Sequence, residues 1–172
     1  MINKILGIDL MKYLLTLLLL FSTHSFSEES LNRYTIDSNG NVDTIVEHNY
    51  SKKHNFKNYT IRGTFEDNLG NYGSSDGTVV AEYKEGKVIN LQWSSKLTYQ
   101  NNKVIFAQGV RKKGIDEAGV GKAILFAGEK PLDILDNVEC NYGIKFFKKN
   151  FFTKWICNIP EKNLKLLQNI NQ

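Results

Sequence analysis

Residues 87–99, KVINLQWSSKLTY, alternate between apolar and polar side chains over almost their whole length. A repeat of two residues is that of a β-strand with one face toward a core and the other toward water. One face would carry Ile89, Leu91, Trp93, Leu97 and Tyr99, interrupted only by Ser95, and the other Asn90, Gln92, Ser94, Lys96 and Thr98. The segment therefore predicts a long strand that is buried on one side.

Strand-like runs fill most of the remaining chain, and short turns separate them. They cover residues 33–48, 58–65, 78–83, 104–112, 119–128, 137–147 and 151–159. The one helical pattern is PEKNLKLLQNI, residues 160–170, in which apolar residues recur at helical spacing. About eight antiparallel strands are best closed into a small barrel, because closure leaves no exposed strand edge. We therefore predict an all-β fold, a small antiparallel eight-stranded barrel with a short C-terminal helix; a two-sheet sandwich is the alternative.

Cys140 and Cys157 are the only cysteines, and the strands around them predict a disulfide. If Phe147 faces Asn150 across a tight turn, Cys140 falls directly opposite Cys157, in a pair where opposing residues lie closest. A bridge here closes a loop of about 17 residues, which adds roughly 3 kcal/mol in the chain-entropy model. A redox pair or a metal site is the alternative, but the sequence has no C-x-x-C motif and no histidine near either cysteine.

The N-terminal residues have the pattern of a secretory signal peptide. Lys12 precedes the apolar run YLLTLLLLF, and small residues lead to a cleavage site after Ser27. Met11 can serve as the start instead of the first residue. The apolar run is too short to span a bilayer. We therefore predict a signal peptide over residues 1–27, a single β-barrel domain over residues 28–172, and a secreted or periplasmic location with no membrane span in the mature protein.

The charge of the chain gives little sign of a nucleic-acid partner. The formal net charge is +4, and the basic residues are scattered rather than gathered into the stripe that a nucleic-acid reader needs. The runs RKK (residues 111–113) and KK (residues 148–149) fall at expected strand ends. We expect solvated turns there, with a patch for an anionic ligand as the alternative.

No arrangement in the sequence predicts a catalytic or metal site. Glu47, His48 and His54 could ligate zinc in principle, but their spacing fits no chelating motif, and we expect a surface loop. Residues 114–124 do not match a phosphate loop. The candidate carboxylates for a hydrolase are Glu66, Asp67, Glu82 and Glu85. Nothing brings two of them together around a cleft, so we predict no catalytic residue, no metal and no cofactor.

Residues 65–80, FEDNLGNYGSSDGTVV, form a glycine-rich connection between two expected strands. An EF-hand loop that begins at Asp67 would need Gly where Tyr72 stands and Glu where Thr78 stands. The stretch is therefore no EF-hand, although a looser oxygen-rich calcium site stays open. We expect it to be a hairpin connection.

The same stretch carries a family resemblance. Gly70-Asn71-Tyr72-Gly73, with Gly77 four residues on, resembles the strand–turn–strand element of the allene oxide cyclase and dirigent-like barrels. Residues 125–144, LFAGEKPLDILDNVECNYGI, resemble that family's later turn and hairpin, with Gly-Glu-Lys in place of the usual Gly-x-Gly. The resemblance implies an eight-stranded antiparallel barrel with a lipophilic interior, often in oligomers. No catalytic residue of the family can be placed on this sequence.

Together these patterns predict a small barrel that binds an apolar small molecule, or scaffolds its reaction, without a catalytic constellation of its own. The predicted ligand-binding residues are Trp93, Tyr99, Phe106, Tyr142 and Trp155. Aromatic side chains at this spacing are more often part of a packed core than the lining of a cavity. A secreted isomerase, cyclase or carboxylate-dependent hydrolase with its site at the barrel mouth is one alternative, and a cell-envelope interaction module is another.

Overall fold

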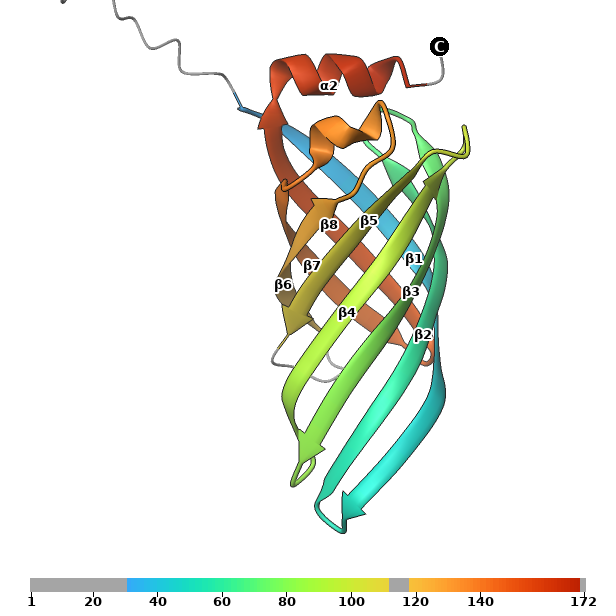
Figure 1. The fold of residues 1–172 in the computed structure, drawn as a ribbon, viewed down its shortest axis with the longest axis vertical. Helices are drawn as coiled ribbons and strands as arrows, with labels where there is room; N and C mark the ends of the chain where they lie inside the picture. The colour runs from blue at the N-terminus through green and yellow to red at the C-terminus, as the bar shows by residue number, and fades with distance from the viewer. Residues whose placement is uncertain (1–30, 112–117, 171–172) are drawn as a thin grey trace, which may run out of the picture.

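The computed structural model describes residues 31–111 and 118–170. Eight strands form one closed antiparallel barrel, in which each strand pairs with the next and β1 pairs with β8 (Figure 1). The strands are β1 (Leu31–Ser51), β2 (His54–Asp67), β3 (Tyr72–Lys84), β4 (Lys87–Tyr99), β5 (Val104–Arg111), β6 (Gly119–Phe126), β7 (Glu139–Phe147) and β8 (Asn150–Pro160). The predicted barrel is therefore confirmed, and the sandwich is not formed. The predicted signal peptide lies outside the described residues.

One end of the barrel, the capped end, carries the helix α2 (Glu161–Gln168) and the short 3-10 helix η1 (Leu132–Leu135) (Figure 1). The predicted C-terminal helix is therefore confirmed. Leu167 of α2 is fully buried in the main core. The Asn71 side chain donates a hydrogen bond to the carbonyl of Leu167 at 3.3 Å, and Asn163 donates to the carbonyl of Ile134 at 2.8 Å. The helix thus closes this end through both apolar and polar contacts.

No helix among the described residues is long and apolar enough to cross a membrane.

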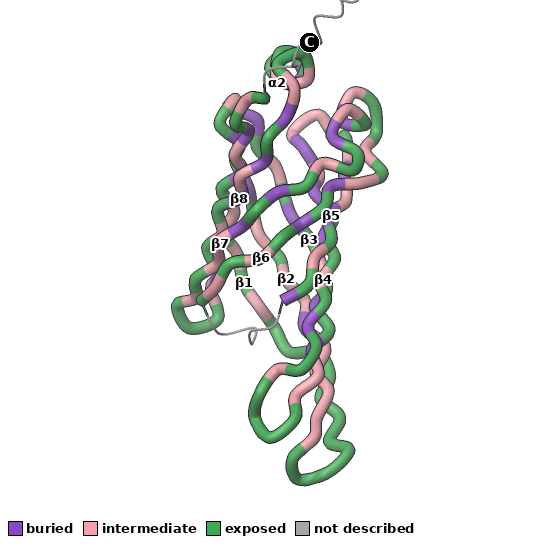
Figure 2. The backbone as a smooth tube through the Cα atoms, turned by 90° about the vertical axis from the view of Figure 1, so that its left-hand side faces the viewer, coloured by how far each residue is buried: buried purple, intermediate pink, exposed green. Residues whose placement is uncertain are grey.

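The opposite end, the hairpin end, has an uneven rim because the strands differ in length. β1 has 21 residues, whereas β5 and β6 have 8 each. Among the described residues, β8 pairs with β1 as far as Asn41, and β5 pairs with β4 from Leu91 onward. The first four strands therefore extend past the others (Figure 1), and their tips are mostly exposed (Figure 2).

Part of this extension was expected to be a loop. The polar residues 47–56 instead belong to β1 and β2, joined by a turn at residues 52–53. His54 lies 2.6 Å from a carboxylate oxygen of Glu82 on β3, while His48 is exposed. The loop prediction is wrong because this extension is held by backbone pairing with a neighbouring strand. Such pairing does not require an apolar face, so the sequence contains no alternating pattern that would reveal it.

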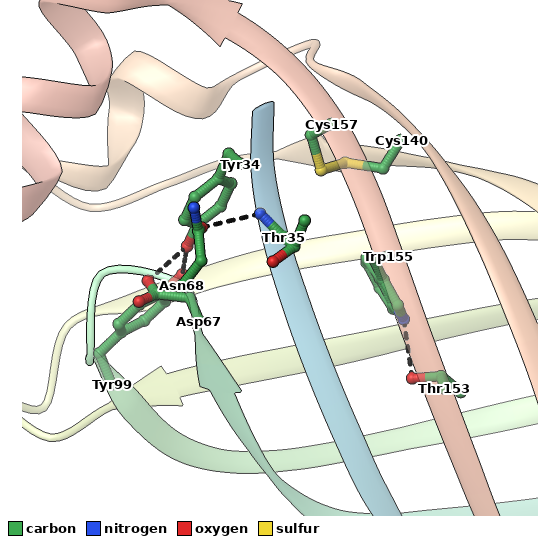
Figure 3. Close-up of a disulfide and its surroundings, with 9 residues drawn as sticks. All are labelled: Tyr34, Thr35, Asp67, Asn68, Tyr99, Cys140, Thr153, Trp155 and Cys157. Carbon is green, nitrogen blue, oxygen red and sulfur yellow. Dashed lines mark hydrogen bonds between the residues drawn. A yellow bond between two sulfur atoms is a disulfide. The ribbon is translucent and has the colours of Figure 1, made fainter. Parts of the chain in front are cut away.

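The terminal hairpin has the predicted register. Phe147 pairs with Asn150, and Cys140 pairs with Cys157. The two cysteines form a disulfide with a Cα–Cα distance of 4.2 Å (Figure 3). Both are buried in the main core. The predicted disulfide is therefore confirmed.

Removing this bridge is expected to lower the free energy of unfolding by roughly 3 kcal/mol, because it closes a loop with a sequence separation of 17. Urea unfolding of the oxidised protein, compared with the double variant Cys140→Ser, Cys157→Ser, would measure the difference. A thiol assay on the unfolded, unreduced protein should find no free thiol. Two free thiols would contradict the bridge.

The glycine-rich connection between β2 and β3 is built around a buried carboxyl group, that of Asp67 (Figure 3). Its two oxygens accept hydrogen bonds at 2.8 to 3.0 Å from the Tyr34 hydroxyl, the backbone N–H groups of Leu69 and Asn71, and the Asn71 side chain. The Tyr34 hydroxyl also lies 3.0 Å from that of Tyr99. This set of residues, the Asp67 cluster, fixes the turn beneath the cap. The predicted hairpin connection is confirmed, but it is short, since β3 already begins at Tyr72.

Candidate ligand-binding cavity

The barrel interior contains a cavity. Its wall consists of Ile36, Ser38, Val42, Ile61, Ser75, Val79, Leu91, Trp93, Ser95, Leu97, Arg111, Tyr142, Ile144, Phe146, Phe151, Thr153 and Trp155. About 680 Å³ is free of protein atoms when the opening to solvent is included, but only about 60 Å³ is open to the centre of a water-sized molecule. The smaller volume is the better guide to what fits, because it excludes crevices between side chains. Typical small-molecule sites measure roughly 300–1,000 Å³, so this cavity is narrow.

Three aromatic side chains, the aromatic cluster, form the centre of the wall: Trp93 of β4, Tyr142 of β7 and Trp155 of β8. The Trp93 ring lies edge-to-face against each of the other two, with ring centroids 5.5 Å apart in both pairs. Trp93 Nε1 donates a hydrogen bond to the Tyr142 hydroxyl at 3.0 Å. Trp155 Nε1 donates one to Thr153 Oγ1, also at 3.0 Å (Figure 3). The rings therefore have fixed orientations and satisfied polar atoms.

Two glycines on the intervening strands make this arrangement possible. A Cβ atom at Gly109 of β5 would lie 2.7 Å from the Trp93 ring, and one at Gly121 of β6 would lie 2.6 Å from the Tyr142 hydroxyl oxygen. The Trp93 ring thus lies directly over Gly109, and the Tyr142 ring lies directly over Gly121. Because the rings are pressed against the wall, they meet in a hydrogen bond and leave the middle of the barrel open.

Arg111 is the one charged residue among the described residues that line the cavity. It continues the inward row of β5, which includes Ile105 and Ala107, and only 7% of its surface is exposed. Burial raises the pKa of the Tyr142 hydroxyl, and the hydrogen bond from Trp93 and the positive charge of Arg111 act in the opposite direction. The guanidinium is therefore close enough to Tyr142 to influence it.

Three of the five predicted ligand-binding residues line the cavity, namely Trp93, Tyr142 and Trp155. Tyr99 also points inward, but it is buried at the capped end in the Asp67 cluster and does not reach the cavity. Phe106 alternates with the buried residues of β5 and packs beside Phe126, with ring centroids 5.9 Å apart. It therefore lies on the outer face and is not among the residues that line this cavity.

Arg111 is the residue that sequence reasoning missed, because the run RKK suggested a solvated turn. That interpretation is wrong for Arg111, which ends a strand and faces the interior. Lys112 and Lys113 lie outside the described residues. The two-residue repeat of the strand could have placed Arg111 in the interior. Arg111 stands two residues after Gly109 and therefore belongs to the same inward row of the strand.

The candidate carboxylates of a hydrolase do not converge on the cavity. Asp67 is buried at the capped end, and Glu66 and Glu85 are exposed. Glu82 contacts His54 near the tips of the hairpins. No Asp or Glu occurs among the described lining residues. Within the described part of the chain, no group of three or more His, Cys, Asp or Glu side chains could hold a metal ion.

Comparisons with known proteins support the fold and go no further. No protein-family model matches the sequence, and no curated protein matches it. Among solved structures, the barrel is similar to the crystal structure of an enzyme from Penicillium herquei, with a TM-score of 0.58 and 13% sequence identity. The match covers 74% of this chain and 95% of that one. At this identity the likeness shows a shared barrel fold, and the allene oxide cyclase and dirigent-like resemblance stays a prediction.

Proposed function

We propose that the protein is a secreted or periplasmic barrel that binds a small apolar molecule in its interior. The observation that supports this most directly is the cavity beside the aromatic cluster, whose wall is mostly apolar. Side chains alone can fill the interior of a barrel of this size. Here the lack of a side chain at Gly109 and Gly121 lets two large rings lie close to the wall. This arrangement favours a ligand-binding site over a packed core.

The narrow shape limits the ligand. A space of about 60 Å³ for a water-sized molecule suits a slender chain better than a bulky ring system. Each methylene group of such a chain that leaves water contributes about 0.8 kcal/mol. An unbranched alkyl chain is therefore the class of molecule that we expect.

Intrinsic fluorescence offers a direct test, because the sequence contains 2 tryptophans and both line the cavity. Titration with decanol, a neutral alkyl probe, should change the emission spectrum in a saturable way, and native mass spectrometry should show one bound molecule. An unchanged spectrum together with no complex by mass spectrometry would contradict the proposed function.

The variant Gly121→Ala should weaken decanol binding by about tenfold or more. The added methyl group would overlap the Tyr142 hydroxyl, so the ring must move into the cavity. We expect an accompanying stability loss of about 1–3 kcal/mol, as for other overpacked interiors. Gly143→Ala is the matched control, since its Cβ would meet no atom within 4 Å. Equal binding by wild type and Gly121→Ala would contradict the assigned site.

The proposed location depends on the predicted signal peptide. The disulfide is compatible with an oxidising compartment. N-terminal sequencing of protein from the periplasm or medium of a bacterial host should give Glu28 as the first residue. An intact N-terminus on protein retained in the cytoplasm would contradict the proposed location.

An isomerase or cyclase is a second candidate, favoured by one observation. The Tyr142 hydroxyl lies in the cavity wall, holds a hydrogen bond from Trp93 and is influenced by the charge of Arg111. A phenol in such a setting can act as a general acid. Chemical conversion of a bound ligand by wild type, lost in Tyr142→Phe, would support an enzyme over a carrier.

A further inference from the structure

Residues 145–154, KFFKKNFFTK, form the tip of the β7–β8 hairpin, and every second residue or nearly so is phenylalanine or lysine, with no acidic residue among them. We refer to them as the Phe–Lys hairpin. Phe146 and Phe151 pair with each other and line the cavity. Phe147 and Phe152 point outward instead and are 65% and 43% exposed. The proposed ligand site therefore uses the inner pair of rings and gives the outer pair no role.

Two lysines of the Phe–Lys hairpin lie over the exposed rings. Lys145 Nζ is 5.9 Å from the centroid of the Phe152 ring, and Lys148 Nζ is 5.6 Å from that of the Phe147 ring. The apolar stem of a lysine can follow such a ring while its ammonium group stays in water. Exposed apolar surface and positive charge therefore occupy the same part of the hairpin.

The other two lysines form ion pairs with the neighbouring strand β1. Lys149 Nζ lies 3.4 Å from an Asp43 carboxylate oxygen, and Lys154 Nζ lies 2.9 Å from one of Asp37. These are the ion pairs of the hairpin within the described part of the chain. The charges of Lys145 and Lys148 are therefore left over, and the surface of the hairpin is positive.

The Phe–Lys hairpin stands beside the rim of the cavity. A hollow next to it is lined by Val42, Asp43, Thr44, Tyr59, Phe146, Lys148 and Lys149, and it shares Val42 and Phe146 with the cavity. The Val42 N–H donates a hydrogen bond to the carbonyl of Lys149 at 2.9 Å, which holds the turn against β1. The exposed rings and lysines are thus carried on a fixed piece of backbone.

The composition of this surface favours a membrane over a protein or a nucleic acid as its partner. Protein interfaces are depleted in lysine, and a nucleic-acid reader needs basic residues gathered into a longer stripe. An anionic bilayer suits both parts of the hairpin at once. Its boundary between head groups and acyl chains accepts apolar rings, and its charged head groups attract the lysines that surround them.

We propose that the Phe–Lys hairpin docks the barrel on a membrane surface that contains anionic phospholipid. Phe147 and Phe152 enter the interface, and Lys145 and Lys148 lie against the phosphate groups. This inference goes beyond the proposed function, which concerns the barrel interior alone. It also brings the rim of the cavity to the bilayer, where apolar molecules gather.

Co-sedimentation with lipid vesicles tests this docking. The chain from Glu28 onward is used, because the apolar run before it would itself bind lipid. Vesicles of phosphatidylcholine with an equal part of phosphatidylglycerol should bind the protein at least about tenfold more tightly than phosphatidylcholine alone, and added salt should weaken this binding. Equal binding to both vesicles, or binding to neither, would overturn the proposal. Capture of a single-stranded oligonucleotide without capture of vesicles would overturn it as well. No cavity ligand is present, so any of these failures leaves the proposed function intact.

Replacing the exposed rings tests the apolar part of the docking surface. The double variant Phe147→Ala, Phe152→Ala should bind the anionic vesicles about tenfold more weakly, since less apolar surface leaves water. Tyr72→Ala is the matched control, because Tyr72 is 60% exposed and lies at the capped end. Both changes are on the outer surface, and thermal unfolding of each variant checks that the barrel stays folded. Equal binding by wild type and the double variant would overturn the role of the rings.

Replacing the lysines tests the charged part. The double variant Lys145→Gln, Lys148→Gln should lose most of the preference for phosphatidylglycerol, since each lysine near an anionic surface contributes roughly a fivefold gain in binding. It should keep its weak binding to phosphatidylcholine. The matched control is Lys96→Gln, Lys103→Gln, which removes two exposed lysines from outside the hairpin. The same loss in both double variants would overturn the assignment to the Phe–Lys hairpin.

Discussion

Replacing Asp67 with alanine is expected to lower the free energy of unfolding by about 3–5 kcal/mol, because several buried donors lose their shared acceptor at once. Four donors point at this one carboxyl group: the Tyr34 hydroxyl, the N–H groups of Leu69 and Asn71, and the Asn71 side chain. In the alanine variant these donors would stay buried without an acceptor, and each unsatisfied buried group costs about 1–3 kcal/mol. The loss should be visible as a lower urea midpoint.

Two further variants make this prediction specific. Asp67→Asn keeps the shape of the side chain but directs its NH₂ group at the surrounding donors. Its loss of unfolding free energy should therefore be smaller than that of the alanine variant and still exceed about 1 kcal/mol. Asp37→Ala is the matched control, because Asp37 pairs with Lys154 on the surface, where such pairs contribute about 0–1 kcal/mol. If the Asp67 and Asp37 variants lost equal stability, the Asp67 cluster would not be the anchor of the capped end.

The second large effect is expected in alkali, where the protein should lose stability above about pH 10. Burial raises the pKa of Tyr34 well above its usual value, and the nearby Tyr99 and Asp67 raise it further. Burial likewise raises the pKa of Tyr99, the hydrogen bond between its hydroxyl and that of Tyr34 acts against this, and Asp67 adds to it. Both hydroxyls therefore stay protonated in the folded protein at a pH where the unfolded chain has lost these protons.

The sign follows from proton linkage. Between the unfolded pKa of about 10 and the raised folded values, the unfolded state binds fewer protons, so the free energy of unfolding falls by about 1.4 kcal/mol per pH unit for each tyrosine. Below about pH 10 this contribution is fully present. Urea unfolding between pH 8 and 12 would measure the slope. Tyr34→Phe should reduce it, whereas the exposed Tyr50→Phe should not. An identical slope in wild type and Tyr34→Phe would contradict the assignment, since lysine titration is common to both.

The parts of the fold that the sequence predicts well are those governed by local rules. The tight turn before Asn150 and the two-residue repeat together fix every pair of the β7–β8 hairpin, including the Cys140–Cys157 pair. Closure of the barrel follows from the number of strands and the need to pair their edges. Neither prediction requires knowledge of a distant contact.

The direction of single side chains was harder to predict where both faces of a strand are apolar. In β5, Val104, Phe106 and Val110 alternate with Ile105 and Ala107, so the repeat alone does not say which face is inside. On the inward face, the Trp93 ring of the neighbouring strand occupies the space above Gly109. Ile89 was expected on the buried face but is 52% exposed, because a bulge there shifts the pairing from Glu82–Asn90 to Tyr83–Val88.

The polar residues of the interior were missed for a different reason. Asp67 was considered as a metal ligand or part of a turn, and its burial depends on Tyr34, which lies 33 residues earlier. Arg111 was judged by its basic neighbours in sequence, whereas it lies in the cavity wall together with Tyr142 of β7. Whether a charged side chain is buried depends on residues from other strands of the barrel. A pattern within one short stretch of sequence does not include those residues.

The uneven rim of the barrel has a consequence for how copies of this protein behave toward one another. Among the described residues, the pairing of β1 with β8 ends at Asn41, followed by one hydrogen bond from the Val42 N–H to the carbonyl of Lys149, and the pairing of β4 with β5 begins at Leu91. Such free edges can recruit strands from other chains and start aggregation. Here the β1 edge carries Asp43 and Glu47, and the β4 edge carries Lys87 beside the bulge at Ile89. Charge and irregular backbone at both edges oppose the addition of a foreign strand.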